Sequence, residues 1–479
     1  MSSPEDILET YEVGPGIYAA IYKSGGLLRY RAVEPRLTAD EEATLKRLKE
    51  ALSDFLPGEE PKRDEGYLSR AVKEAARRFR VEVPESAWDK IFYYLKRDLL
   101  GYGKIDPLLR DPLIEDVHLD GPGVPVYVWH TKWESLPTDV TLDREEVERL
   151  VQRVASFAGR HISYAQPILE AMSPEGFRVE IVYPPVSAAP AFTIRKYFMS
   201  PITLVDMIKM GTASPELVAY LWLMLDYGRN IVIVGPTGAG KTTLLNALLY
   251  LIRPTAKIIT IEDTREINIV HEHWQALVTR PSFDPSVRAV TAFDLLQVAM
   301  RSRPDYVIVG EIRGEEAYVL FQAFASGHSG ATTIHADTVE DAVRRLLSRP
   351  MSVPPVLLSL AHIFVRILRV RRGGNVVRRI VEVYENLGGE SPQLRLVFKW
   401  DPQSDAISRV APSALLEAVS KSFFVELQEL EEDLKAREEA ISLMHKHGLS
   451  SPVAVARVAS AYYLNREEAL KRLREGKLP

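Results

Sequence analysis

The spacing of hydrophobic residues changes several times along the chain, and each change marks an expected element. Residues 17–33, IYAAIYKSGGLLRYRAV, predict two short β-strands joined by a turn at KSGG. A helix should follow, because Thr38 and Glu41 have the spacing of a capping box, in which each side chain bonds the other residue's backbone N–H. Residues 56–66, LPGEEPKRDEG, are rich in proline, glycine and charge and predict a linker. We therefore expect a small α+β domain over residues 1–65.

Residues 66–200 mix helical and strand-like segments. Helices are expected over about 85–100 and about 143–158, each ending at a glycine suited to the left-handed position after a helix. The segments VPVYVWH, FRVEIVYPP and AFTIRKYF predict strands. This pattern indicates a second α+β domain, which we expect to be PAS-like, followed by a linker over 201–214.

Residues 215–400 alternate apolar runs with helical segments. The runs NIVIVG, KIITIED, DYVIVGE and ATTIHA predict a mostly parallel sheet with helices on both faces. After them, FVRILRVRRGGNVVRRIVEVYE predicts a hairpin around Gly373 and Gly374, whose basic residues we interpret as a solvated face rather than a site for lipid or a partner. The fold class is therefore α/β in this region, preceded by a mixed α+β region.

The tail, residues 401–479, is predicted to be helical and charged. One apolar seam recurs at three- and four-residue steps, and we expect it to pack on its own domain rather than on a partner. The seam comprises Leu427, Leu430, Leu434, Ile441 and Met444.

Composition narrows the possible functions. The chain has 479 residues, 60 basic and 65 acidic, for a formal charge of -5, so no overall positive field is available to hold nucleic acid. It contains no cysteine, which excludes a disulfide framework, a thiol nucleophile and a Cys-ligated zinc. Neither a signal peptide nor an apolar span of about 18 residues is expected, since the closest candidate, 353–370, carries His362, Arg366 and Arg369. A cytoplasmic protein is expected.

The segment NIVIVGPTGAGKTTLLNALLYLI combines a strand, a glycine loop and a helix. It fits the pattern G-x-x-x-x-G-K-[ST], whose backbone N–H groups wrap a phosphate at the positive N-terminus of a helix. Lys241 should reach the β- and γ-phosphates, and the Thr242 hydroxyl should ligate Mg²⁺. We expect ATP and Mg²⁺ to bind through Gly235, Pro236, Thr237, Gly238, Ala239, Gly240, Lys241, Thr242 and Thr243.

Polar residues follow three other predicted strands, at Glu262 and Asp263, at Glu311 and Arg313, and at His335. Ligands of open α/β sheets bind at the carboxyl ends of strands, so these groups predict one site with the glycine loop. Glu311 is expected to hold Mg²⁺, directly or through water, or to activate the attacking water. The alternatives are a strand-end glutamate paired with Arg313 and, for Glu262 and Asp263, ordinary turn or cap residues.

Four motifs in order make the chain resemble the ATPases of the type II and type IV secretion superfamily, particularly the archaeal branch that drives type IV pilus and archaellum assembly. They are GPTGAGKTT (Walker A), TIEDTRE (Asp box), RSRPDYVIVGEIRGEE (Walker B) and ASGHSGATTIHADT (His box). The resemblance covers roughly residues 15–385. It implies a RecA-like P-loop motor domain over 215–400, catalytic roles for Glu262, Glu311 and Arg313, and a hexamer. It further implies a polytopic platform protein of the cytoplasmic membrane as partner.

The resemblance also implies arginines that reach a neighbouring subunit's nucleotide from the preceding domain. Arg178 and Arg195 match those motif positions best, with Arg160 a weaker third. Exposed strand arginines are the alternative. Many bacterial relatives carry a tetracysteine zinc element, and the absence of cysteine implies that this chain has none.

SGHSGATTIHA places two histidines seven residues apart, which first suggests a metal site. No cysteine is present to complete such a site, and carboxylate ligands would have to come from the magnesium site. By resemblance we interpret His335 as a γ-phosphate sensor and His328 as its support. A helix-capping role remains the alternative for His328.

The sequence is compatible with three functions: an ATP-hydrolysing assembly motor, a nucleic-acid translocase with a similar core, and a nucleotide switch that does not hydrolyse ATP. Net acidity counts against the second. The presence of both Lys241 and Glu311 counts against the third.

Overall fold

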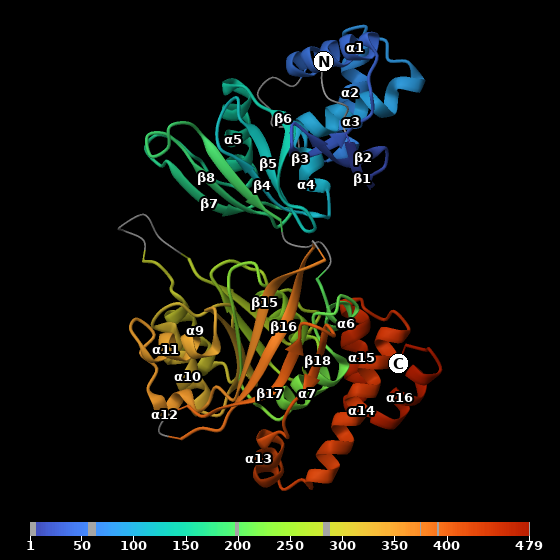
Figure 1. The fold of residues 1–479 in the computed structure, drawn as a ribbon. Coiled ribbons are helices and arrows are strands. Elements are labelled where there is room, and N and C mark those ends of the chain that lie inside the picture. The colour runs from blue at the N-terminus through green and yellow to red at the C-terminus, as the bar shows by residue number, and fades with distance from the viewer. Residues whose placement is uncertain are drawn as a thin grey trace. The chain divides into compact units, whose positions relative to one another are not determined.

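A computed structural model describes residues 6–55, 64–196, 201–280, 288–373, 375–389 and 392–478. The chain forms two compact units, Met1–Met199 and Ser200–Pro479, each with its own hydrophobic cores (Figure 1). The predicted linker over 56–66 falls mainly on residues 56–63, which lie outside the described residues.

The first unit is built on one nine-stranded sheet of order β1-β2-β3-β6-β5-β4-β9-β8-β7. The predicted hairpin and capped helix are present, since β2 and β3 pair antiparallel and Thr38 and Glu41 bond each other's backbone N–H before α1. Its strands are β1 (Asp6–Gly14), β2 (Ile17–Ser24), β3 (Leu27–Val33), β4 (Ile114–Leu119), β5 (Pro125–His130), β6 (Glu134–Thr141), β7 (Ile168–Met172), β8 (Arg178–Val182) and β9 (Ala191–Arg195). Its helices are α1 (Ala39–Phe55), α2 (Glu65–Arg78), α3 (Trp88–Leu99), α4 (Asp106–Arg110) and α5 (Arg144–Phe157), with short 3-10 turns at Glu85–Ala87 and Gly103–Ile105.

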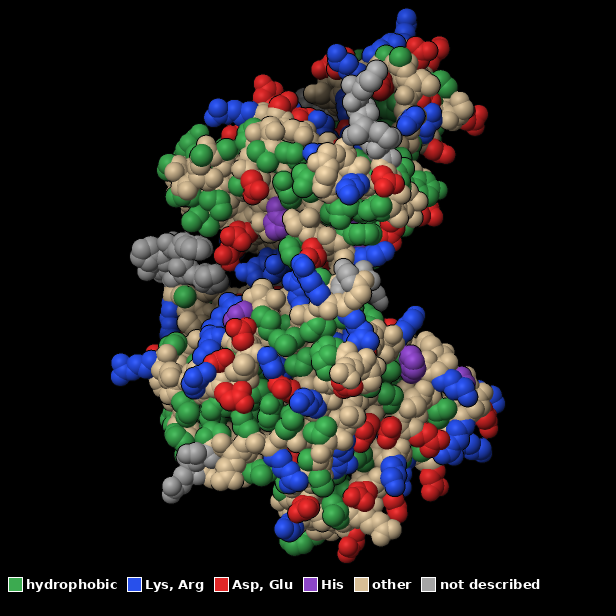
Figure 2. Space-filling model, in the orientation of Figure 1, with side chains coloured by type: hydrophobic (Ala, Val, Ile, Leu, Met, Phe, Trp, Pro, Cys, Tyr) green, Lys and Arg blue, Asp and Glu red, His purple; other side chains and the backbone are tan. Residues whose placement is uncertain are grey.

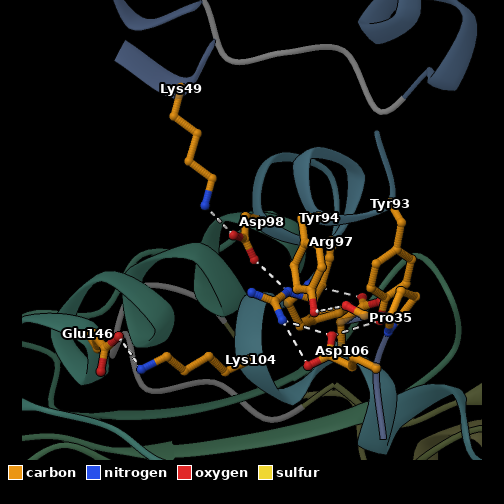
Figure 3. A network of polar contacts seen from close by, with 12 residues as sticks. Pro35, Lys49, Tyr93, Tyr94, Arg97, Asp98, Lys104, Asp106 and Glu146 are labelled. Atoms are coloured by element: carbon orange, nitrogen blue, oxygen red, sulfur yellow. Dashed lines mark hydrogen bonds and ion pairs between the residues drawn. The ribbon is translucent and has the colours of Figure 1, made fainter. Parts of the chain in front are cut away.

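The boundary predicted after residue 65 lies inside this unit. Strand β3 pairs with β6 at Tyr30 and Thr138, so the N-terminal hairpin extends the same sheet. Figure 3 shows a polar network between helix α3 and the segments on either side of that boundary. Arg97 pairs with Glu34 at 2.8 Å and with Asp98 at 2.7 Å, and Lys49 of α1 pairs with Asp98 at 2.5 Å. Long-range pairing therefore joins the two predicted N-terminal domains.

The second unit is a nine-stranded sheet of order β12-β11-β13-β14-β10-β15-β16-β17-β18, parallel from β12 to β15 and antiparallel beyond. The predicted mostly parallel sheet and the hairpin are thus present, although Gly374 lies outside the described residues. The strands are β10 (Ile231–Gly235), β11 (Ile258–Glu262), β12 (Trp274–Val278), β13 (Tyr306–Val309), β14 (Ser329–His335), β15 (Ile363–Arg372), β16 (Asn375–Asn386), β17 (Leu394–Asp401) and β18 (Ala406–Arg409).

Strand β10 is apolar throughout because both faces of the sheet are covered. Ile231 and Ile233 belong to the core beneath α7 and α8, whereas Val232 and Val234 belong to the core on the opposite face. The helices are α6 (Leu204–Lys209), α7 (Pro215–Asp226), α8 (Lys241–Leu249), α9 (Ala292–Arg301), α10 (Glu316–Ala325), α11 (Val339–Leu347), α12 (Pro355–Leu358), α13 (Ala414–Phe423), α14 (Leu427–Lys446), α15 (Pro452–Leu464) and α16 (Arg466–Arg474).

Residues 201–214, the predicted linker, are folded into this unit. They contain α6, which begins at a capping box of Thr203 and Asp206, and Leu204 and Val205 are buried in the core. The N–H of Ile380 in β16 donates to the carbonyl of Thr212. The predicted linker is therefore part of the second unit, although Met210 remains 49% exposed.

The C-terminal helices pack on the same unit, as their apolar seam predicts. Leu430, Leu434, Ile441 and Met444 are buried on the α7 side, while Leu427 at the start of α14 remains 37% exposed. The boundary predicted at residue 400 therefore crosses one continuous core. No helix among the described residues has the length and apolar character needed to cross a membrane.

Candidate nucleotide site

The glycine loop connects β10 to α8 and has the conformation of a phosphate cradle. Gly238 and Gly240 have φ values of +72° and +95°, which favour glycine. A Cβ on Gly235 would lie 2.4 Å from the carbonyl oxygen of Ile367 in β15, so no larger residue fits there. The residues present fit a nucleotide phosphate, because the loop ends at the N-terminus of α8 with its N–H groups unused by the helix.

Lys241 begins α8 and folds back over the loop. Its Nζ donates to the carbonyl of Pro236 at 3.1 Å. Burial lowers the pKa of Lys241, and the nearby Glu311 partly opposes this effect. Thr242 and Thr243 are half-buried in the first helical turn, and Ala239 is buried beneath the loop. A phosphate at this position would add a close charge partner for the half-buried Lys241 ammonium.

The strand order brings the predicted polar groups to one edge of the sheet. The strands β11, β13, β14 and β10 are neighbours and all parallel, so their carboxyl ends align. His335 is the register partner of Gly235. Gly310, which precedes Glu311, lies against Glu262, since a Cβ on Gly310 would be 3.1 Å from the Cγ of Glu262. Glu262, Glu311 and His335 therefore lie along the same edge of the sheet as the glycine loop, and His335 is the nearest of the three in strand order.

Glu262 is the most deeply buried carboxylate of this edge, at 5% exposure. Its Oε1 accepts from the backbone N–H groups of Glu266 and Ile267, both at 2.9 Å. Its Oε2 is buried and has no hydrogen-bond donor among the described residues. Burial raises the pKa of Glu262 to about 7, although the two N–H donors act in the other direction. The adjacent Asp263 instead accepts from the Thr279 hydroxyl at 3.1 Å.

Glu311 accepts a close ion-pair hydrogen bond from Arg313. The ion pair anticipated as an alternative for these residues is therefore formed, and it raises the pKa of Arg313. The Arg313 side chain is 66% exposed and that of Glu311 is 26% exposed, so the pair lies at the surface of the sheet edge.

The two histidines of the His box lie at opposite ends of β14, about 20 Å apart for a strand of this length. The Nδ1 of His335 lies 3.3 Å from the Thr237 hydroxyl in the glycine loop. The Nδ1 of His328 lies 3.1 Å from the carbonyl of Ala323 in the last turn of α10, which is the helix-capping contact. His335 therefore lies at the glycine loop, whereas His328 lies at the C-terminal end of α10.

The predicted arginines of the first unit lie side by side. Arg178 of β8 and Arg195 of β9 are register partners across the sheet. Arg195 pairs with Asp116 at 2.7 Å, and Arg178 lies 3.8 Å from a carboxylate oxygen of Glu170. Both side chains are more than one-third exposed. Arg160 lies outside this pair, in the turn that follows α5.

The sequence did not predict that the hairpin lies beside the glycine loop. The hairpin strands β15 and β16 border the glycine loop, and the Nε of Arg378 donates to the carbonyl of Gly238 at 3.2 Å. The sequence presents Arg378 only as part of a basic run, and a separation of 140 residues carries no signal of this contact.

Comparison with known proteins decides the family. A family model described as "Type II/IV secretion system protein" matches residues 127–377. The chain belongs to the type II/IV secretion system protein family. Its P-loop unit is accordingly the RecA-like domain of a secretion ATPase, and the protein is a nucleotide-binding ATPase.

Two relatives and one solved structure illustrate what the chain is similar to. An archaeal relative, "Uncharacterized protein MJ0900" of Methanocaldococcus jannaschii, is 38% identical over 428 residues, which span 82% of this chain and 77% of the relative. "Type IV secretion system protein PtlH" of Bordetella pertussis is 31% identical over 324 residues, 60% of this chain and 95% of PtlH. The crystal structure of the VirB11 ATPase from the Brucella suis type IV secretion system is 29% identical, covering 61% of this chain and 97% of that one, with a TM-score of 0.31.

Proposed function

We propose that this secretion ATPase is a hexameric motor that hydrolyses ATP to power assembly of a type IV pilus, an archaellum or a related secretion machine at the cytoplasmic membrane. The observation that carries the proposal is the alignment of Glu262, Glu311 and His335 along the sheet edge that also holds the glycine loop. A scaffold without turnover would not need a buried carboxylate, a second strand-end carboxylate and a loop-contacting histidine together.

In this proposal the residues of the sheet edge have the following tasks. Lys241 and the loop N–H groups would hold the β- and γ-phosphates, and Thr242 with Glu311 would hold Mg²⁺, directly or through water. The ion, when bound, neutralises charge on the phosphates. Glu262 and Glu311 orient and deprotonate the attacking water, and Arg313 joins the phosphates. His335 senses the γ-phosphate and transmits its presence to the glycine loop. His328 supports strand β14, which carries His335.

Arg178 and Arg195 act in a neighbouring subunit's site in this scheme. Two adjacent guanidinium groups on one exposed sheet face suit a phosphate that belongs to another chain. The membrane partner would be a polytopic platform protein, and no zinc is required.

The test of hydrolysis is Glu311→Gln. This variant should bind ATP as the parent does and lose turnover by about 100-fold or more, because the carboxylate acts after binding. The control is Glu315→Gln, an exposed carboxylate on the same segment, which should keep full activity. Parental turnover in Glu311→Gln would remove Glu311 from catalysis.

A separate experiment tests whether the ATPase works with a membrane-bound assembly machine. A pull-down from native membranes with the parent as bait should retain a polytopic membrane protein. Stimulation of the ATPase by single-stranded nucleic acid, without any membrane partner, would instead favour a nucleic-acid translocase. The formal charge of -5 argues against that second function.

A further inference from the structure

Arg366 of β15 joins the β15–β16 hairpin to the segment that follows His335. Its Nε donates to the carbonyl of Asp337 at 2.8 Å, and its Nη1 donates to a carboxylate oxygen of Glu382 in β16 at 2.8 Å. Figure 2 shows Lys and Arg side chains gathered at the end of the sheet where this hairpin turns, whereas the side chain of Arg366 is only 20% exposed, farther along β15. Two acceptors hold this guanidinium in one orientation.

The strand order explains why this connection crosses the strand that leads into the glycine loop. Strand β10 lies between β14 and β15. Arg366 is the register partner of Val234, and His335 is that of Gly235, the first residue of the loop. Neighbouring strands lie about 4.8 Å apart, so β14 and β15 are separated by about 10 Å. Arg366 is long enough to span this distance, and it does so at the point where the loop begins.

Two arginine side chains hold the backbone on either side of the His335 side chain's attachment. Arg345 of α11 donates to the carbonyl of His335, and Arg366 donates to the carbonyl of Asp337. From this backbone the imidazole of His335 reaches the Thr237 hydroxyl of the glycine loop, 3.3 Å from Nδ1. The position of the imidazole therefore depends on where these two carbonyls are held.

Glu382 fixes the direction in which Arg366 points. The two residues are register partners in the antiparallel pair, and the register shifts by one residue directly after them. A bulge of this kind changes the direction of a neighbouring side chain and is frequent next to functional sites. With Nη1 bound to Glu382, the Nε–H of Arg366 is the donor that meets the Asp337 carbonyl. The ion pair therefore orients the donor as well as joining the two strands.

We propose that Arg366 is a positioning residue for ATP hydrolysis, which holds His335 at the glycine loop through the carbonyl of Asp337 and is itself oriented by Glu382. A side chain that acts on a phosphate must be held to within about 0.5 Å of its productive position. The inference rests on the proposed function, because it needs the role of His335 in the nucleotide site. It does not depend on which machine the motor drives.

The competing explanation is that the ion pair between Arg366 and Glu382 only stabilises the hairpin. In that case its loss would lower the Tm and leave the turnover of the folded enzyme unchanged. A positioning role would instead lower turnover, and it would do so only while the imidazole of His335 is present. Measurements of turnover in two backgrounds therefore separate the two explanations.

The experiment measures kcat, the Kd of a non-hydrolysable ATP analogue and the Tm. Arg366→Gln should lower kcat about 10-fold and change the Kd by less than about threefold, because the phosphates are held by the glycine loop and Lys241. In the His335→Ala background, Arg366→Gln should change kcat by less than about twofold, since its effect passes through the imidazole.

Arg366→Lys separates function from stability. The lysine keeps the positive charge opposite Glu382 but lacks the planar fork that binds two acceptors in different directions. Its kcat should fall about as far as that of Arg366→Gln, while its Tm should stay close to that of the parent. This variant keeps the proposal testable if Arg366→Gln is poorly folded.

Arg379→Gln is the matched control. Arg379 belongs to the same hairpin and pairs with Asp405 at 2.8 Å, and it also donates to the carbonyl of Met210 rather than to the His335 segment. Arg379→Gln should lower the Tm at least as much as Arg366→Gln does and should keep kcat within about twofold of the parent.

Parental kcat in both Arg366 variants would overturn the positioning role, as would an equal loss from Arg366→Gln with and without the His335 imidazole. Parental kcat in His335→Ala would remove the role of His335 and with it this inference. A parent without any turnover would overturn the proposed function itself, so the failures are distinguishable.

Discussion

The imidazole Nδ1 of His335 lies 3.3 Å from the hydroxyl of Thr237, so the last residue of β14 contacts the glycine loop itself. The carbonyl of His335 also accepts a hydrogen bond from Arg345 of α11. A single residue therefore links the glycine loop, the end of β14 and α11.

We expect His335→Ala to reduce turnover by about 10- to 100-fold and to change ATP affinity by less than about threefold. The side chain touches the loop hydroxyl and no backbone N–H of the phosphate cradle, so binding should survive its loss. Steady-state rates and equilibrium binding of a non-hydrolysable ATP analogue would check this. Equal losses in both would indicate that His335 only supports the fold.

Stability should depend on pH through Glu262. Its folded pKa of about 7 exceeds the ordinary value of 4.5, so the folded chain holds a proton that the unfolded chain releases. The free energy of unfolding should therefore fall as pH rises from about 4.5 to about 7, by up to about 3 kcal/mol.

Glu262→Gln removes this titration while its amide oxygen can still accept from the N–H groups of Glu266 and Ile267. Its stability advantage over the nucleotide-free parent should be absent near pH 4.5 and largest above pH 7. Urea unfolding at several pH values measures the difference. A difference that does not change with pH would show that folding does not raise the pKa of Glu262.

The arginines of the first unit should act between subunits. Arg178→Ala or Arg195→Ala should lower turnover although neither residue lies in the P-loop unit. Mixing either variant with Lys241→Ala should restore part of the activity, because the second variant supplies intact arginines to sites with an intact loop. Absence of rescue at every mixing ratio would contradict a shared site.

Arg437 should be a major determinant of the stability of the C-terminal helices. It is 3% exposed, pairs with Asp226 at 2.7 Å and Asp433 at 2.9 Å, and lies over the ring of Trp222. Arg437→Ala would remove the ion-pair partner of the half-buried Asp226 and one of the partners of Asp433, which keeps Tyr462 and Arg466, and should cost about 3–5 kcal/mol in urea unfolding. Arg474→Ala breaks an exposed pair with Glu439 and should cost less than about 1 kcal/mol. Similar costs for both would contradict the buried pair.

Local patterns predicted the elements of the site well. The run IVIVG is apolar at every position, as a strand covered on both faces must be, and β10 is such a strand. The glycine loop, the hairpin at Gly373 and the capping box at Thr38 each depend on residues within a few positions of one another. Such features depend on short-range steric contacts and hydrogen bonds between residues that are close in the sequence, so they can be predicted from the sequence alone.

Contacts between distant segments were decided only by the tertiary structure. The pairing of Tyr30 with Thr138 merged two expected domains into one sheet, and the packing of α14 against α7 merged two others into one core. The hydrogen bond from Arg378 to Gly238 shows that the basic run of the hairpin lies next to the nucleotide site. The amino-acid sequence by itself determined the family and the chemistry of the loop, because both depend on adjacent residues. The tertiary structure determined which charges surround that loop, because strand order sets those distances and no local pattern encodes it.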